Sequence, residues 1–339
     1  MPHGRLFFDW NSTTPPLPAA IEAVVRAWSS AWGNPSSVHA EGRAAKASLE
    51  ASRAAVAALV GARPMDVVFT SGGTEASNLA LRSAFSASKT GALVLAPTEH
   101  ASILAVARAL EGEGVEVRWL RVRPSGHVDL EHAKELLAAR NVKLVTIQAA
   151  NGELGVIQPV EELAHLAHEA GALVHVDAIQ GVGRFAPPLG DYLLHADAVS
   201  LAAHKIRGPK GIGALVARSS FRVRPVLLGA TQERGLRPGT QDAALAAGFA
   251  VAAREASASV ASYQAVAPAR DRLEAGLVAI AGDDVAINGT APRVPHVLHV
   301  SFRGWPSPEL VAALDLEGLS VSGGSACHSG VPEPSPTLE

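Results

Sequence analysis

The hydrophobic pattern of the chain changes its period repeatedly up to about residue 217. Short apolar runs alternate with longer segments in which apolar residues recur every three or four positions. The short runs predict buried strands, and the longer segments predict amphipathic helices. The predicted strands are residues 67–70, 93–96, 115–122, 144–148, 173–176, 198–201 and 214–217. The predicted helices are residues 18–29, 41–60, 101–111, 130–139 and 160–169, with a further helix beginning at residue 74. This alternation is typical of an α/β protein with a mostly parallel sheet and helices on both faces.

The pattern becomes mainly helical after residue 239. It predicts a long alanine-rich helix over 239–267, helices over 269–280 and 308–314, and a strand over 297–302. A chain of 339 residues is long enough for roughly two domains. We therefore predict an N-terminal arm (1–18), a large domain (19–242) and a smaller α+β domain (243–339).

Composition and charge narrow the classes of partner. The chain is 48% hydrophobic and 18% charged, as expected for a globular protein with a large core. Its formal net charge of -3 provides no basic field for nucleic acid or anionic membranes. The first residues lack a signal-peptide pattern, and charges or glycines interrupt every apolar stretch. The single cysteine, Cys327, excludes an internal disulfide and suits a reducing compartment. We expect a cytoplasmic protein without nucleic-acid or membrane partners.

Two charged residues stand at the ends of predicted strands. Lys205 follows an apolar run in SLAAHKIRGPKGIG (200–213), and Asp177 ends another in ALVHVDAIQ (172–180). An ammonium in such a place either pairs with an anion or loses its proton and becomes a nucleophile able to form a Schiff base. A carboxylate and an amine at one sheet edge are also what pyridoxal phosphate requires. A buried ion pair between Asp177 and Lys205 remains the alternative.

Three further segments place polar groups after predicted strands or beside glycines. Gly73 and Thr74 begin a predicted helix, whose free amides suit a phosphate, although an ordinary turn has the same pattern. His100 follows a predicted strand, where its ring either stacks on a flat ligand ring or caps a helix. Thr240 follows Gly239, and its hydroxyl either binds a ligand or caps a helix.

Cys327 lies in SGGSACHSG (322–330), whose small residues predict neither a stable helix nor a packed strand. The segment favours a reactive thiol on a mobile loop, and a small buried hydrophobic residue is the alternative. His165 and His168 have helical spacing, but no third ligand accompanies them, so we predict no metal site.

Eight motifs distributed over nearly the whole chain resemble the cysteine desulfurases of the NifS/IscS type. They are GNPSSVH (33–39), FTSGGTEASN (69–78), TEHASIL (98–104), NGELGVIQP (151–159), HVDAIQ (175–180), HKIRGPKGIGAL (204–215), QERGLRPGT (232–240) and SGGSACHSG (322–330). The resemblance implies the class V aminotransferase fold, which is the aspartate aminotransferase-like fold type I of enzymes that depend on pyridoxal phosphate. The cysteine segment resembles the branch with an extended, mobile cysteine loop.

The resemblance also implies a role for each candidate residue. Lys205 would hold pyridoxal 5'-phosphate as the internal aldimine and then move protons, and Asp177 would pair with the pyridinium nitrogen, which keeps the Asp177 carboxylate ionised. His100 would stack on the ring and take part in proton transfer. Gln180 would contact the ring oxygen, and Asn151 would contact the substrate. The phosphate would be bound by Gly73, Thr74 and His204. In a homodimer, Thr240 would reach the phosphate in the partner subunit.

The implied reaction converts L-cysteine to L-alanine. Cys327 would attack the sulfur of the substrate adduct and carry a persulfide to an acceptor or scaffold protein, for example in iron–sulfur cluster assembly, where the persulfide would contact a cluster. Three departures from the family pattern stand out: Gly152 replaces an asparagine, Ala202 replaces a serine, and the small domain is shortened, without the arginine that binds the substrate carboxylate. The alternatives are a selenocysteine lyase or another amino-acid lyase of this fold, and a catalytically impaired paralogue that binds the cofactor as a partner or scaffold.

Overall fold

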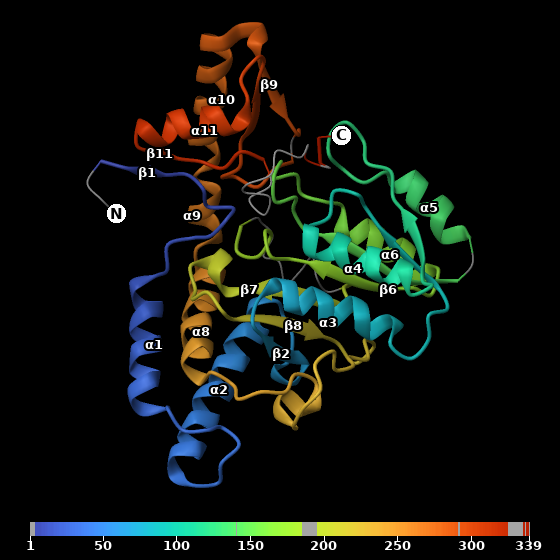
Figure 1. Ribbon diagram of the computed structural model, residues 1–339, viewed down its shortest axis with the longest axis vertical. Helices are drawn as coiled ribbons and strands as arrows, with labels where there is room; N and C mark the ends of the chain where they lie inside the picture. The colour runs from blue at the N-terminus through green and yellow to red at the C-terminus, as the bar shows by residue number, and fades with distance from the viewer. Residues whose placement is uncertain are drawn as a thin grey trace.

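A seven-stranded sheet forms the centre of the computed structural model, which describes residues 4–139, 141–184, 195–290, 292–324, 335 and 337–338 (Figure 1). The strand order is β2-β8-β7-β6-β5-β3-β4. Strands β4, β3, β5, β6 and β7 are parallel, and β8 runs antiparallel to both of its neighbours. The strands are β2 (Val67–Thr70), β3 (Ala92–Leu95), β4 (Glu116–Trp119), β5 (Val142–Gln148), β6 (Leu173–Asp177), β7 (Ala198–Ala202) and β8 (Gly213–Ala217). The predicted mostly parallel sheet is confirmed.

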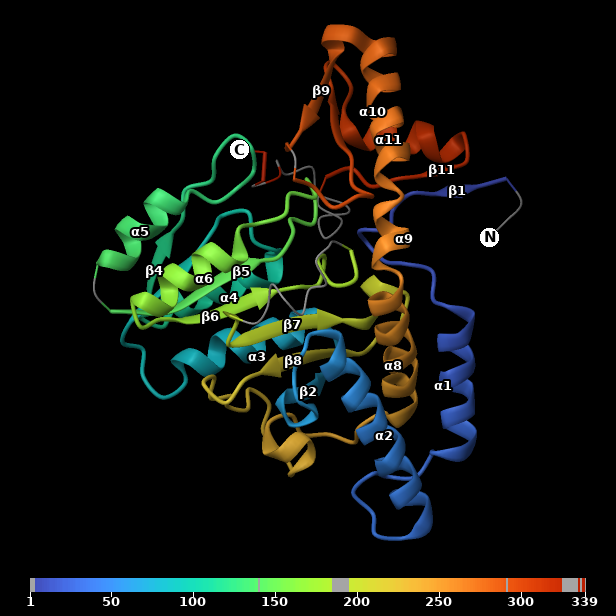
Figure 2. The same cartoon turned by 180° about the vertical axis from the view of Figure 1, so that it is seen from behind.

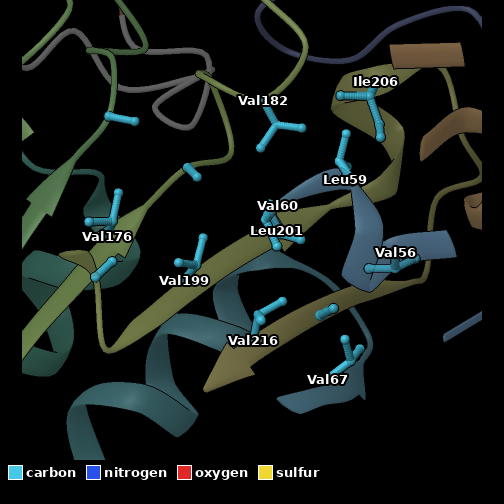
Figure 3. Close-up of a cluster of buried hydrophobic side chains, with 14 of the residues drawn as sticks. Val56, Leu59, Val60, Val67, Val176, Val182, Val199, Leu201, Ile206 and Val216 are labelled. Carbon is cyan, nitrogen blue, oxygen red and sulfur yellow. The ribbon is translucent and has the colours of Figure 1, made fainter. Parts of the chain in front are cut away.

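Helices cover both faces of this sheet, because successive strand residues point to opposite sides. Val94 belongs to one hydrophobic core and its neighbours Leu93 and Leu95 belong to the other. The smaller core lies under α3 (Gly73–Phe85) and α4 (Ala101–Gly112). The larger core, part of which Figure 3 shows, contains residues of the following helices. They are α1 (Pro18–Ser30), α2 (Ala40–Leu59), α5 (Leu130–Ala138), α6 (Val160–Glu169) and α8 (Ala243–Ala258).

The single helix predicted over 239–267 is wrong, because the chain forms several shorter helices there. Gly239 has a φ of +103°, which no right-handed helix contains, and α8 begins only after Asp242, whose Oδ1 accepts hydrogen bonds from Ala244 N and Leu245 N at 2.9 Å each. At the other end, the Ser259 hydroxyl donates to Glu255 O at 2.7 Å, a local bond that competes with helix continuation. Short α9 (Val260–Gln264) and α10 (Ala267–Ala281) follow.

A smaller group of elements lies beyond one end of the sheet, together with the first residues of the chain (Figure 1, Figure 2). Strand β9 (Val285–Asn288) pairs antiparallel with β10 (His299–Phe302), and α11 (Ser307–Leu316) follows. Strand β1 (Leu6–Phe7) pairs in parallel with β11 (Leu319–Ser320), so part of the N-terminal arm forms regular structure. The division into domains stays a proposal. Because α8 packs on α1 and α2 within the larger core, we propose a boundary near residue 259 rather than at 242.

None of the helices in the described part of the chain combines the length and the apolar character needed to cross a bilayer.

Candidate active site

A cavity of about 270 Å³ lies at the carboxyl ends of β5, β6 and β7. Val176 points into the larger core, so the neighbouring side chain of Asp177 points to the sheet face that α3 and α4 cover. Eight predicted site residues from five motifs line this cavity: Gly73, Thr74, His100, Asn151, Asp177, Gln180, His204 and Lys205. The polar residues that follow the predicted strands therefore indicated the position of the cavity, because ligands of such sheets bind at the carboxyl ends of the strands.

Lys205 reaches the cavity from a short turn directly after β7. The 3-10 turn Ala203–Ile206 carries it, and Arg207, with a φ of +69°, ends the turn. The Lys205 ammonium donates to the carbonyl oxygens of Asn11 and Ser12, the latter at 3.0 Å. The N-terminal arm thus lies against the amine.

Asp177 is 5% exposed and terminates β6. One carboxylate oxygen, Oδ1, accepts a hydrogen bond from Ile179 N at 3.0 Å. Burial raises the pKa of Asp177, while the charge of His100, the Ile179 hydrogen bond and the charge of Lys205 oppose that rise. The expected ionised state of Asp177 therefore depends on a positive group in the cavity.

The N-terminus of α3 forms the polar end of the cavity. Gly73 packs so closely on Ile179 that a Cβ at residue 73 would overlap the Ile179 side chain. A second cavity of about 480 Å³ is contiguous with the first, since Gly73, Thr74 and His204 line both, and it also contains Lys210. Free helix amides and an ammonium together suit an anion.

His204 is neutral in this setting. Burial, together with the charges of Lys205, Lys210 and Arg184, lowers the pKa of His204 to about 4. Its Nδ1 lies 3.1 Å from Thr13 Oγ1. Ala202 lines the cavity without the hydroxyl of the family pattern, and Ser12, Thr13 and Ser71 supply hydroxyl groups to the adjacent cavity.

Three predicted residues combine a cavity position with a local structural contact. His100 caps α4, because its Nδ1 accepts from Ser102 N at 3.1 Å. Gln180 Nε2 donates to Asn11 O at 2.9 Å, and its Oε1 accepts from Arg184. Asn151 Oδ1 accepts from Leu154 N at 2.7 Å, so this amide also holds its own loop. Gly152, which replaces an asparagine of the family, binds Asn11 through its carbonyl oxygen at 2.7 Å.

A polar layer lies one strand repeat below the residues that line the cavity. His175 Nδ1 lies 2.8 Å from Thr146 Oγ1, and its Nε2 lies 2.9 Å from Ser200 Oγ, which in turn contacts Ser77 Oγ at 3.2 Å. Burial lowers the pKa of His175 to about 3, so this ring is neutral. The layer links β5, β6, β7 and α3 beneath Asp177.

The sequence analysis missed several polar residues around the cavity. Asn11 and Ser12 form part of its wall, and the polar run that follows Trp10 is the sequence signal for them. Arg184 is 2% exposed and donates to Lys205 O at 2.8 Å. Glu99 lines the cavity beside His100.

Of the predicted site residues that the structure describes, only Thr240 is not among those that line the cavity. Thr240 is exposed. Cys327 lies outside the described residues, although Ser322 and Gly324, which precede it, line the cavity.

His165 packs edge-on against His195 at 5.7 Å between ring centroids, and His168 Nε2 lies 2.8 Å from Asp197 Oδ2. Within the described ranges, no three His, Cys, Asp or Glu residues cluster as metal ligands.

The fold is that of the class-V aminotransferases. The model of this family, described as aminotransferase class-V, matches residues 6–336, and the chain belongs to the family. A cysteine desulfurase of Cereibacter sphaeroides is 40% identical over 334 residues, which cover 98% of this chain and 85% of that relative. An IscS-like cysteine desulfurase of Mycobacterium tuberculosis is 39% identical, with 98% and 86% covered. A solved NifS-like protein superposes with a TM-score of 0.89 at 32% identity, covering 94% of this chain and 87% of its own. SspA in complex with cysteine has a TM-score of 0.81 at 29% identity, with 98% and 93% covered.

Proposed function

We propose that this protein is a pyridoxal phosphate-dependent cysteine desulfurase, which converts L-cysteine to L-alanine and passes the sulfur to an acceptor through a persulfide on Cys327. The observation that carries the proposal is the convergence of Lys205, Asp177 and His100 on one cavity of a class-V aminotransferase. Relatives named cysteine desulfurase over nearly the whole chain support the choice of reaction.

The chemistry of the cavity fits pyridoxal phosphate from one end to the other. The amides at the start of α3, together with Thr74 and His204, suit the phosphate. Asp177 supplies the carboxylate for a protonated ring nitrogen, and Gln180 supplies an amide for the ring oxygen. When bound, the cofactor supplies an aldehyde that condenses with amines and a ring that withdraws electrons from the resulting adduct.

The chain's own residues then move protons and sulfur. Lys205 would supply the amine that binds the cofactor and, once released, would act as a base towards the substrate. His100 lines the same cavity and offers its imidazole for stacking and proton transfer. Asn151 is proposed to contact the substrate. Cys327 is the only thiol of the chain, and Gly324, three residues earlier, already lines the cavity.

A homodimer is part of the proposal. Helix α1 exposes an apolar row in which Ile21, Val25, Trp28 and nearby Trp32 are 50% to 68% exposed. Such a row on a surface helix indicates contact with another protein surface. Thr240 is exposed, as a residue that reaches the phosphate site of a partner subunit must be. We propose an iron–sulfur or other sulfur-transfer scaffold as acceptor, and the cytoplasm as the compartment, because the single thiol suits reducing conditions.

The test is turnover of L-cysteine by the purified protein. We expect equal amounts of alanine and transferable sulfur, and one added sulfur on the peptide that contains Cys327. Cys327→Ser should bind cofactor and L-cysteine normally, yet form alanine more than about 100-fold more slowly, because a hydroxyl is a poor nucleophile towards sulfur. Alanine formation by Cys327→Ser at the wild-type rate would exclude the desulfurase mechanism and favour a lyase.

A further inference from the structure

Two buried glutamates of this protein have opposite surroundings. Glu233 is 3% exposed and Glu99 is 4% exposed. Glu233 accepts four hydrogen bonds: from both terminal nitrogens of Arg53 at 2.6 and 2.8 Å, from Phe69 N at 2.9 Å and from Gln241 Nε2 at 2.8 Å. Burial raises the pKa of Glu233, but the hydrogen bonds and the charge of Arg53 outweigh it and lower the pKa overall. Glu233 is therefore an ionised, compensated carboxylate.

Glu99 has almost none of this support. Its Oε1 accepts a single hydrogen bond, from Gln148 N at 3.0 Å. Its Oε2 is buried, and no donor from the described residues lies within hydrogen-bond distance of it. Burial first, and then the negative charge of Asp177, raise the pKa of Glu99 well above its usual range. A buried carboxylate with one donor and no cation is costly, so such a group normally keeps its proton.

Glu99 and Asp177 line the same cavity, and the groups around them decide which of the two is ionised. Asp177 accepts from Ile179 N and is favoured as an anion by the charges of His100 and Lys205. The other titratable groups nearby, His175 in the layer below and His204 beside Lys205, are neutral because burial lowers their pKa values to about 3 and about 4. The negative charge is thus better placed on Asp177.

We propose that Glu99 is a neutral carboxylic acid in the folded protein, with its proton on the buried Oε2, and that it is a positioning residue that keeps a second buried negative charge away from Asp177. A second anion at Glu99 would compete with Asp177 for a protonated ring nitrogen and for the ammonium of Lys205. The neutral acid avoids this competition. The protonation of Glu99 follows from the protein alone, and only its benefit to cofactor binding rests on the proposed function.

The first test measures the proton itself. Infrared difference spectra between the wild type and Glu99→Gln, recorded on the full chain at neutral pH, should contain the C=O stretching band of one protonated carboxylic acid. The matched control, Glu233→Gln, should lose only carboxylate signals. A Glu99→Gln difference that contains carboxylate bands alone would overturn the inference. Glu99→Met serves the same comparison if the glutamine variant does not fold.

The second test measures cofactor retention without turnover. Glu99→Gln keeps the shape and neutrality of the acid, so its dissociation constant for pyridoxal phosphate should stay within about 3-fold of the wild-type value. Asp177→Asn should still bind the cofactor through the phosphate end of the cavity, but the absorption spectrum of the bound cofactor should change markedly. An equal spectral change in Glu99→Gln would mean that Glu99 carries charge, against the inference. If the wild type itself binds no pyridoxal phosphate, the proposed function fails, while the infrared result still decides the protonation of Glu99.

Discussion

Asp177 is a residue whose charge depends on what lies beside it in the cavity. Burial raises the pKa of this carboxyl, and the charge of His100, the Ile179 hydrogen bond and the charge of Lys205 oppose that rise. In the proposed function, a protonated pyridine nitrogen would be a further positive neighbour. The carboxylate and the ring nitrogen would then stabilise each other's charge, which would keep the ring able to withdraw electrons.

Asp177→Asn should separate cofactor binding from catalysis. The amide has the size of the carboxylate and leaves the phosphate end of the cavity intact, so cofactor should still bind. Without the negative charge the ring nitrogen loses its proton, and alanine formation should fall by about 100-fold or more. Absorbance spectra and alanine assays on the same sample check both parts. Unchanged alanine formation would remove Asp177 from this role.

Lys205→Ala should abolish the covalent link to the cofactor. Treatment with borohydride, followed by mass spectrometry, should fix pyridoxal phosphate on Lys205 in the wild type and on no lysine in the variant. Lys134→Ala is the control, because Lys134 pairs with Glu131 on the exposed surface of α5 and lines neither cavity. A reducible adduct that persists in Lys205→Ala would assign the link to another amine.

Glu99 makes the stability of the protein depend on pH in a definite direction. An unfolded glutamate has a pKa of about 4.3, and burial raises the pKa of Glu99 well above it in the folded state. At pH values between these two pKa values only the folded state holds the proton. The contribution of Glu99 to the free energy of unfolding is therefore present at low pH, and it falls by about 1.4 kcal/mol per pH unit as the pH rises. Relative to Glu99→Gln, the wild type should therefore lose free energy of unfolding from mildly acid to neutral pH. Urea denaturation at several pH values measures this difference, and parallel pH profiles would contradict a raised pKa.

At the level of elements, the pair between Arg53 and Glu233 connects three parts of the large domain. Arg53 lies on α2 and also donates to Val67 O on β2 at 3.1 Å, while Glu233 belongs to the loop that leads to Thr240. Glu233 and Arg234 both have positive φ values, of 46° and 59°, which are unfavourable for these residues. The buried pair holds this strained loop against the sheet.

Arg53→Met should be strongly destabilising. It leaves the buried carboxylate of Glu233 without its cation, a loss of about 3–5 kcal/mol in free energy of unfolding. Arg26→Met is the control, because Arg26 pairs with Glu22 on the exposed surface of α1 and should have little effect. Denaturant titrations of the two variants provide the comparison. Similar small effects in both would show that the buried pair adds no net stability.

Elements with a long, regular pattern were predictable from the sequence, and short ones were not. The sheet strands and α1 to α6 follow apolar periodicity closely, and the strand-end residues Asp177 and Lys205 came with them. Strand β1 has two residues and pairs with a strand more than 300 residues away, which no local pattern can indicate. Helix α8 was misjudged at both ends because alanine favours helix everywhere, while Asp242 and Ser259 set the limits through their own hydrogen bonds. The protonation of Glu99 depends on neighbours from other elements and was likewise outside the reach of the sequence.

At the level of the whole molecule, the N-terminal arm contacts both strand β11 and the cavity. Strand β1 pairs with β11, and a few residues later Asn11 and Ser12 accept hydrogen bonds from Lys205. Gly324, shortly after β11, lines the same cavity. A shift of the smaller group of elements would therefore move the cavity wall directly.

The proposed homodimer makes a prediction that distinguishes between contacts within and between subunits. If Thr240 reaches the phosphate site of the partner subunit, its loss must impair the partner and not its own chain. Two mixed dimers with two separable tags contain the same substitutions in different arrangements. The first joins a Lys205→Ala/Thr240→Ala chain to a wild-type chain. The second joins a Lys205→Ala chain to a Thr240→Ala chain.

Each mixed dimer has one chain with Lys205, so each has one site able to link the cofactor. In the first dimer that site faces the partner's alanine at position 240, and cofactor affinity should fall by about 10-fold or more, the scale of a hydrogen bond to a charged group. In the second dimer the site faces an intact Thr240 and should bind normally. Titration with pyridoxal phosphate, read by absorbance, measures both affinities. The reverse order would mean that Thr240 serves its own subunit, and a chain that remains monomeric at every concentration would remove the dimer from the proposal.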